Sequence, residues 1–357
     1  MKRFFAVLLC VSMFGIWSCK RDRSFDSSGE QGQNLCPVEF SVAGFDLQQQ
    51  AAATKTNNIN LTEGTTVRVL VYKRAGAVPN LSADRFVTEK TYRIHSDGSF
   101  LPCETDADGV VTSPNAKPME LGGGDYDFYA YAPAVAMTAR PTLRVEHGTD
   151  LIATDVVTKF VGGRRTNVDL LFAHKASQLH FTVTRKADAN TVFAVSMQDE
   201  GVKIEKLAAS PAVYTLGGDI TVAGTSYNGV SEIPGSRFTT VNEYTTAALD
   251  TVLAREANTS AADDLRLTFN ILVNEALYKT YTATVSRQQL RPGNRYLFNV
   301  LVKDGGAVLT LFELLPWTRN VLTDLEVGGD PSNGIVLGEW TEAGWSTGMG
   351  DEGVVPF

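Results

Sequence analysis

The chain contains few of the residues and runs on which several classes of protein depend. Its 357 residues include only four histidines and four cysteines, and no extended block of Lys or Arg. A protein that binds nucleic acid needs a basic surface to neutralise phosphates, whereas the formal net charge here is −8. The composition therefore excludes nucleic acid as an expected partner.

An apolar run long enough to span a bilayer is also missing at the start of the chain. Residues 4–14 are apolar except for Ser12, whereas a transmembrane helix needs about 20 such residues. With Lys2 and Arg3 before it, the run is typical of a signal-peptide core. Residues 16–19, Ile-Trp-Ser-Cys, resemble the lipobox of bacterial lipoproteins. The resemblance implies that Cys19 is lipidated and becomes the first mature residue, and the alternative is an ordinary secretory leader with a chance cysteine.

Cysteine is too scarce to form a disulfide framework. Cys10 lies in the leader and Cys19 takes the lipid, which leaves Cys36 and Cys103. In an oxidising exterior these two residues can pair and tie the start of the mature chain to a later loop. They can equally remain two unrelated small residues, and the sequence leaves both interpretations open.

Motifs that carry catalysis or bind metal are not recognisable. His174 and His180 would share one side of a continuous strand, but no third ligand stands at a familiar spacing. Residues 122–124, Gly-Gly-Gly, precede a strand, whereas a phosphate-binding loop leads into a helix. Residues 106–109, Asp-Ala-Asp-Gly, lack the terminal Glu of a calcium loop. We expect no metal, no cofactor and no enzymatic activity.

Apolar residues instead recur with a period of two, which indicates β-strands. Turn-forming residues separate the alternating runs, and the best candidate for a helix is the short segment Ala247–Ala257. The expected strands are Val38–Val42, Val67–Tyr72, Tyr126–Tyr131, Asn167–Phe172, Leu179–Val183, Leu265–Phe269, Tyr281–Val285, Tyr296–Val302 and Val308–Leu311.

Many short strands with turns between them predict an all-β protein built of β-sandwiches, and a chain of this length needs about two. The polar residues 24–34 cannot bury enough apolar surface to fold and indicate a tether. The expected organisation is a lipoprotein signal peptide at 1–18, a tether at 19–35, sandwiches at 36–172 and 173–320, and a tail at 321–357.

Two tryptophans stand out in the Gly-rich tail. Trp340 and Trp345 are the aromatic residues least suited to a core position, because the residues around them are small or polar. Exposed aromatic rings stack on sugars, so the pair is a candidate ligand site. Aromatic residues in strands more often pack in a core or on a sheet face.

Three segments together resemble the fimbrillin-like family, which comprises the subunits of type V pili and related lipoproteins. They are Tyr126–Pro133 after a Gly-rich turn, Leu171–Leu179 at the expected domain join, and Leu290–Val300 followed by a strand and residues 315–317, Leu-Pro-Trp. The resemblance covers most of the mature chain. It implies two transthyretin-like Greek-key β-sandwich domains.

The resemblance also implies a route of assembly. Polymerising members of the family lose their first strand to a trypsin-like, often Arg-specific, protease, and a neighbour's C-terminal segment fills the groove. Here the removable strand would be Val38–Val42, and the donor would be Val321–Val327 or Ile335–Trp340. Lys55 is the only basic residue between Ser24 and Val67. It is therefore the one candidate protease site, and the alternative is a subunit that keeps both its strand and its lipid.

These features predict a structural and adhesive subunit of a bacterial fimbria. The expected partners are other fimbrial subunits, a lipid anchor in the outer membrane and a host or glycan ligand. The expected location is the cell surface. The alternative is a surface lipoprotein that binds a glycan or another host ligand without polymerising.

Overall fold

The fold is built almost entirely of β-strands. The computed structural model describes residues 35–42, 61–222, 226–242, 244–286, 288–304, 306–316 and 341–347. Two 3-10 turns, η1 (Gly235–Arg237) and η2 (Ala261–Asp263), are the helical elements of these residues. The all-β prediction is confirmed. In the described part of the chain, no helix is long and apolar enough to cross a membrane.

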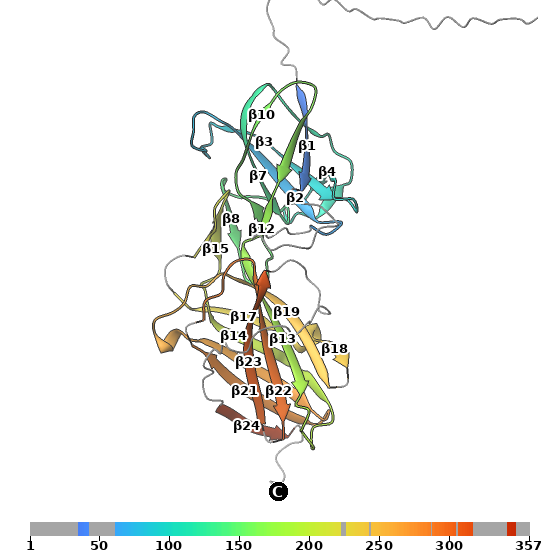
Figure 1. Cartoon of the computed structure of the whole chain (residues 1–357), viewed down its shortest axis with the longest axis vertical. Coiled ribbons are helices and arrows are strands. Elements are labelled where there is room, and N and C mark those ends of the chain that lie inside the picture. The colour runs from blue at the N-terminus through green and yellow to red at the C-terminus, as the bar shows by residue number, and fades with distance from the viewer. Residues whose placement is uncertain are drawn as a thin grey trace, which may run out of the picture. The chain divides into compact units, whose positions relative to one another are not determined.

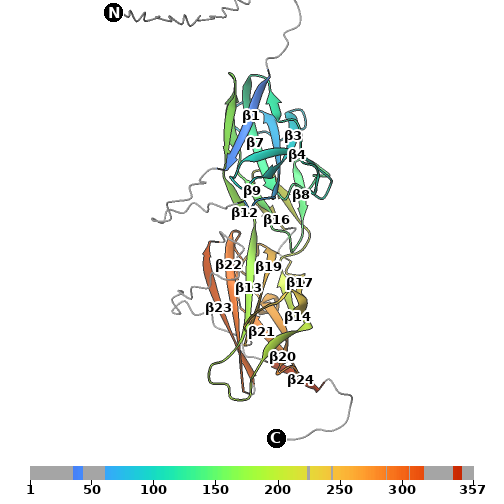
Figure 2. The same ribbon diagram turned by 90° about the vertical axis from the view of Figure 1, so that its right-hand side faces the viewer.

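Strands from the N-terminal half, residues 35–174, form two sheets that enclose one core (Figures 1 and 2). A three-stranded sheet has the order β11-β1-β6, and a larger sheet runs β12-β9-β7-β2-β3-β4-β5 with β10 paired to β7. The strands are β1 (Cys36–Val42), β2 (Thr66–Lys73), β3 (Phe86–Ile94), β4 (Phe100–Thr105), β5 (Val111–Ser113), β6 (Met119–Leu121), β7 (Gly124–Ala132), β8 (Thr142–Val145), β9 (Ile152–Thr154), β10 (Val157–Val161), β11 (Thr166–Leu170) and β12 (Phe172–His174).

The C-terminal half, from residue 176 onward, has two five-stranded sheets with the orders β18-β19-β13-β22-β23 and β17-β14-β20-β21-β24. Its remaining strands, β15 and β16, belong to a separate sheet. The strands are β13 (Ala176–Arg185), β14 (Val195–Leu207), β15 (Ala212–Thr215), β16 (Ile220–Thr221), β17 (Gly229–Ile233), β18 (Thr239–Asn242), β19 (Thr245–Leu253), β20 (Leu265–Val273), β21 (Leu277–Val285), β22 (Asn294–Lys303), β23 (Gly306–Pro316) and β24 (Thr341–Thr347).

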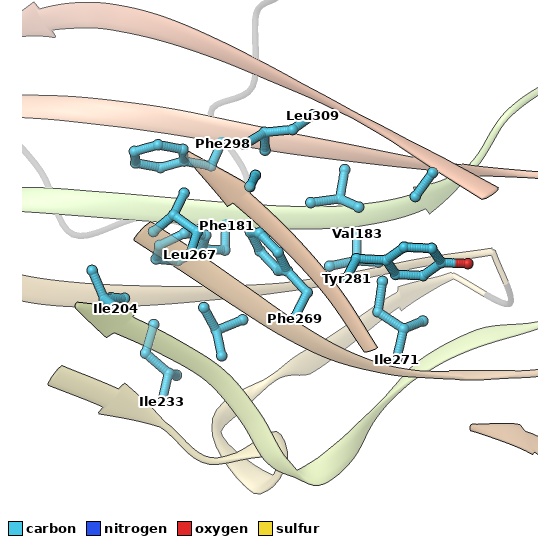
Figure 3. Close-up of a cluster of buried hydrophobic side chains, with 14 of the residues drawn as sticks. Phe181, Val183, Ile204, Ile233, Leu267, Phe269, Ile271, Tyr281, Phe298 and Leu309 are labelled. Carbon is cyan, nitrogen blue, oxygen red and sulfur yellow. The ribbon is translucent and has the colours of Figure 1, made fainter. Parts of the chain in front are cut away.

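The core of this half follows from strict alternation along its strands. In β20 every second residue from Leu265 to Val273 is buried, because successive side chains of a strand point to opposite faces. Phe181 stacks on Phe298 with ring centroids 5.0 Å apart and meets Phe269 edge-on at 5.8 Å (Figure 3). Rings from both sheets therefore meet in one apolar layer, which is the arrangement of a β-sandwich.

A third, small sheet joins the two halves. Its order is β16-β15-β8, so a hairpin of the C-terminal half pairs with a strand of the N-terminal half. A separate apolar cluster lies at this junction. It draws residues from both halves: Leu70, Tyr72, Tyr129, Tyr131, Leu143, Val145, Leu151, Ala153, Ala208, Ala212, Tyr214, Leu216 and Leu253.

Two local predictions were wrong. The expected helix at Ala247–Ala257 is instead strand β19, which pairs with β13 over nine residues. The expected strand Asn167–Phe172 breaks at Leu171, which is 45% exposed, so that β11 and β12 join different sheets. In both places pairing with distant strands overrides the local pattern. The domain boundaries and the transthyretin-like topology stay predictions.

Candidate functional site at the first strand

β1 is the middle strand of its sheet although it lies near the start of the chain. It pairs in parallel with β11 from Val38↔Thr166 to Val42↔Leu170. On its other side it pairs antiparallel with β6 at residues 36–38. Both backbone edges of β1 are therefore engaged over part of its length.

The inward face of β1 completes the core of the N-terminal half. Cys36, Val38, Phe40 and Val42 alternate along the strand and are each at most 8% exposed. Burial of one such Val or Phe side chain contributes about 1.5–3 kcal/mol. The strand is consequently a large part of the core as well as a backbone partner.

Phe40 lies at the centre of an aromatic cluster. Its ring centroid is 5.2 Å from that of Tyr92, 6.0 Å from Phe128 and 6.1 Å from Phe100. The three neighbours come from β3, β7 and β4 of the opposing sheet. A groove vacated by β1 would expose these rings.

The outward face of β1 is polar and solvent-exposed. Glu39 forms an ion pair with Arg165 at 3.1 Å, and both side chains are about half exposed. Ser41 donates a hydrogen bond to Asp169 at 2.5 Å. Exposed ion pairs contribute little to stability, so the inward face and the backbone ladder hold the strand.

Cys36 and Cys103 are buried and carry free thiols in this structure. The Sγ atom of Cys36 lies 3.5 Å from Oγ1 of Thr166 on β11. Cys103 lies on β4, and burial raises the pKa of its thiol. The candidate disulfide is not formed here.

The C-terminal tail contributes one described strand. β24 pairs antiparallel with β21, and Trp345 stands opposite Lys279 in that ladder. Trp340 and both predicted donor segments, Val321–Val327 and Ile335–Trp340, lie outside the described residues. Cys19 and Lys55, the predicted lipidation and protease sites, also lie outside them.

The four histidines are scattered over the fold. His174 lies 2.7 Å from Asp150 and His95 lies 3.2 Å from Asp97. His180 is 1% exposed on β13, and burial, with a smaller effect of Arg295, lowers its pKa to about 4. Groups of three or more residues able to hold a metal ion are absent from the described part of the chain.

The sequence predicts β1 and most of β11 as strands, but it does not predict β6 or the pairing of β1 with either neighbour. β6 shows a buried-exposed-buried pattern at residues 119–121, and β11 alternates from Thr166 to Leu170. The alternation was visible, but nothing in it indicates which distant strand is the partner. The pairing that makes β6 and β11 the walls of the candidate groove therefore follows only from the structure.

Comparison with known proteins gives one family and one fold. Residues 35–321 match a family model described as fimbrillin-like. A comparison with curated proteins gave no match.

The similar solved structures include three candidate cell adhesion proteins of Bacteroides. The protein from Bacteroides fragilis is 20% identical with a TM-score of 0.58, and the match covers 81% of this chain and all of that one. The protein from Bacteroides uniformis is 18% identical (TM-score 0.51), and that from Bacteroides ovatus is 15% identical (TM-score 0.53); each match covers 80% of this chain and 99% of the other. At these identities the similarity shows the fold alone.

Proposed function

The chain belongs to the fimbrillin-like family, and from that premise we propose that it is a structural and adhesive subunit of a bacterial fimbria. The subunit is exported as a lipoprotein on Cys19 and reaches the surface of the outer membrane. Its partners are other fimbrial subunits and a host or glycan ligand. A structural role of this kind needs no enzymatic activity.

The position of β1 carries the proposal. Loss of the strand would leave the inner edges of β6 and β11 unpaired and would open an apolar slot lined by Tyr92, Phe100 and Phe128. Unpaired edges and exposed apolar surface are both unfavourable in water. An extended segment from another subunit would satisfy the edges with its backbone and the slot with alternate side chains.

The donor segment in this proposal comes from residues 321–357. β24 supports the idea, because residues 341–347 of this tail pair along a sheet edge at β21. The acceptor would be the groove of β1 in the next subunit.

A second candidate function follows from the scarcity of basic residues near β1. Residues 24–67 contain no arginine, and Lys55 is their only lysine. A chain that is not cut there keeps β1 and its lipid, and then acts as an anchor or as a surface lipoprotein that binds a glycan. Binding to a carbohydrate array that disappears in the Trp340→Ala/Trp345→Ala variant would favour this second function.

Cleavage at Lys55 tests strand exchange directly. We expect a Lys-specific protease to cut the native protein there and a synthetic peptide of residues 35–42 to exchange with the cut strand. The Lys55→Gln variant is the matched control, since it should stay uncut at this position and reject the peptide. A cut protein that never takes up the peptide would contradict the proposal.

The donor role is tested by deletion. A chain without Val321–Phe357 should fold and be exported, because the one described strand of the tail is an edge strand. It should no longer join fibres, and a normal fibre yield would exclude the tail as donor.

A further inference from the structure

His147 lies where the two halves of the chain meet. It follows β8 of the N-terminal half, and its ring lies between the end of β14 and the end of β19 of the C-terminal half. The Nε2 atom is 3.1 Å from the carbonyl oxygen of Ala208, and the amide of Leu253 is 3.2 Å from Nδ1. Both ring nitrogens therefore bond to the other half.

These two partners fix the tautomer of the ring. A backbone amide can only donate, so Nδ1 must accept from Leu253, and a carbonyl can only accept, so Nε2 must carry the proton. The neutral imidazole satisfies both bonds. An imidazolium carries a proton on each nitrogen, and the proton on Nδ1 would oppose the amide of Leu253.

Further contacts hold the backbone of this segment in place and crowd one side of the ring. The amide of His147 bonds to Oγ of Ser210 at 3.4 Å, and the amide of Gly148 bonds to the carbonyl of Thr251 at 2.7 Å. A Cβ atom at Gly229 would come within 2.8 Å of Nε2, so β17 presses closely against the ring. Rotation of the ring would break its bonds to Ala208 and Leu253, while the backbone amides keep this segment against the C-terminal half.

The bonds of His147 hold the edge of a larger joint. β8 and β15 pair over four residues, from Val145↔Ala212 to Thr142↔Thr215. Leu253, whose amide bonds to His147, is fully buried in the apolar cluster that both halves share. His147 is thus a titratable group that bonds directly to the contact between the two halves.

We propose that His147 is an acid-sensitive latch, whose neutral ring fastens the N-terminal half to the C-terminal half and whose protonation releases Leu253 and loosens the joint. The inference does not depend on the fimbrial role. It rests on the two opposed bonds of one imidazole across the joint.

The charged groups near the ring do not reverse this expectation. Asp250 of β19 favours the imidazolium, but burial is the largest effect and lowers the pKa of His147. The carboxylate of Asp250 already accepts a hydrogen bond from Ser231 at 2.7 Å and lies 3.4 Å from Arg237. Its negative charge is therefore shared with other partners.

Charged residues on the adjoining strands are either paired with other residues or exposed to solvent. Arg144 and Glu146, on and after β8, pair at 3.0 Å and are exposed. At the end of β14, Glu205 pairs with Lys203 at 3.1 Å, and Lys206 lies 3.8 Å from Asp263. On β17, Glu232 is exposed to solvent.

The sign of the pH dependence follows from the lowered pKa. The opened joint exposes an ordinary imidazole with a pKa of about 6.5, whereas the closed joint has a lower one. The open form binds more protons below pH 6.5, so opening becomes easier as the pH falls. Between pH 6.5 and the pKa of the closed form, the opening constant should rise by up to about tenfold per pH unit.

Hydrogen exchange of the full chain at pH 7, 6 and 5, corrected for the intrinsic rate, measures this opening. Peptides that contain Leu253, β8 and β15 should lose protection as the pH falls. The His147→Gln variant, which keeps a donor and does not titrate, should lose this slope. Peptides of β20 are the internal control.

Asp250 and His180 also titrate in acid. Wild type and His147→Gln both contain these two residues, so they cannot cause a difference in slope between the two proteins. An equal slope in wild type and His147→Gln, or a slope confined to Leu253, would overturn the latch. If His147→Gln does not fold, nuclear magnetic resonance of the wild-type protein tests the latch by following the titration of the His147 ring. The ring must then titrate below pH 6.5 together with the Leu253 amide, and a normal or independent titration would overturn the proposal.

Discussion

β1 and β13 are both middle strands of their sheets, yet they are built differently. β1 alternates between buried and exposed residues, with solvent on its outward face. β13 has eight consecutive buried residues from Ala176 to Val183. β1 pairs with β11 over five residues and with β6 over three, whereas β13 pairs with β19 over nine and with β22 over eight.

The difference indicates which strand could be replaced by another. A strand with one solvent-exposed face and short ladders loses only the packing of its inward face and a few backbone hydrogen bonds when it leaves its sheet. A strand buried on both faces and bonded along its whole length cannot leave without unfolding the sandwich around it. Exchange is therefore expected at β1 and not at β13.

The largest expected loss of stability comes from a substitution on the inward face of β13. Phe181→Ala removes a fully buried ring that stacks on Phe298 and meets Phe269. The free energy of unfolding of the C-terminal half should fall by about 3–5 kcal/mol, because the cavity adds to the lost transfer energy. Urea denaturation monitored by near-ultraviolet circular dichroism measures this loss, and a value below 1 kcal/mol would contradict the close packing of the three rings.

The matched change in β1 should cost less and act locally. Phe40→Ala removes a ring that is 7% exposed, and we expect a loss of about 3 kcal/mol. Hydrogen exchange should show faster opening of β1, β6 and β11 while β2 and β7 stay protected. Equal loss of protection across the whole N-terminal half would contradict the difference between the two strands. It would mean that β1, like β13, cannot leave its sheet without unfolding the surrounding sandwich.

The outward face of β13 offers a smaller, pH-dependent test. Neither ring nitrogen of His180 has a hydrogen-bond partner, and its cross-strand neighbours are Leu249 and Leu297. A buried polar group without a partner is unfavourable, so His180→Leu should stabilise the half by about 1 kcal/mol at pH 7.

The benefit of His180→Leu should grow in acid. The pKa of His180 is lowered to about 4, so wild type loses stability as the pH falls from about 6.5 toward 4. Between pH 7 and 5 that loss is about 2 kcal/mol by the linkage relation. Urea midpoints of both proteins at the two pH values measure it, and parallel pH profiles would show that His180 is not the titrating group.

The smallest effect is expected on the outward face of β1. Glu39→Gln removes an ion pair with Arg165 that is half exposed on both sides. The change in free energy of unfolding should be under about 1 kcal/mol and should shrink further in 0.5 M salt. A larger loss would mean that the outward face of β1 helps to hold the strand in its sheet.

Local alternation located some of the strands, missed others such as β3 and β14, and paired none of them. β1, β2, β7, β13 and β20 all lie where a period of two predicts them. At β19 the adjacent residues Ala247 and Ala248 interrupt the alternation, so the local sequence predicts a helix, and the nine-residue ladder with β13 overrides that preference. Strand partners are set by contacts between distant residues, which periodicity does not record.

The joint between the halves shows the same limit. β8 and β15 are four residues long and lie about 70 residues apart, too short and too distant to predict as partners. His147 carried no motif, since its role depends on Ala208 and Leu253 of the other half. The lipobox at Cys19, by contrast, is local and readable, and it lies outside the described residues.

The parallel ladder between β1 and β11 has a consequence for the order of folding. Ser41 and its partner Asp169 are 128 residues apart. Among the described ladders, this one joins the strands that lie farthest apart in the sequence. The entropic cost of closing a loop rises with its length, and contacts between distant residues form slowly. The pairing of β1 with β11 is therefore expected among the last steps in folding of the N-terminal half.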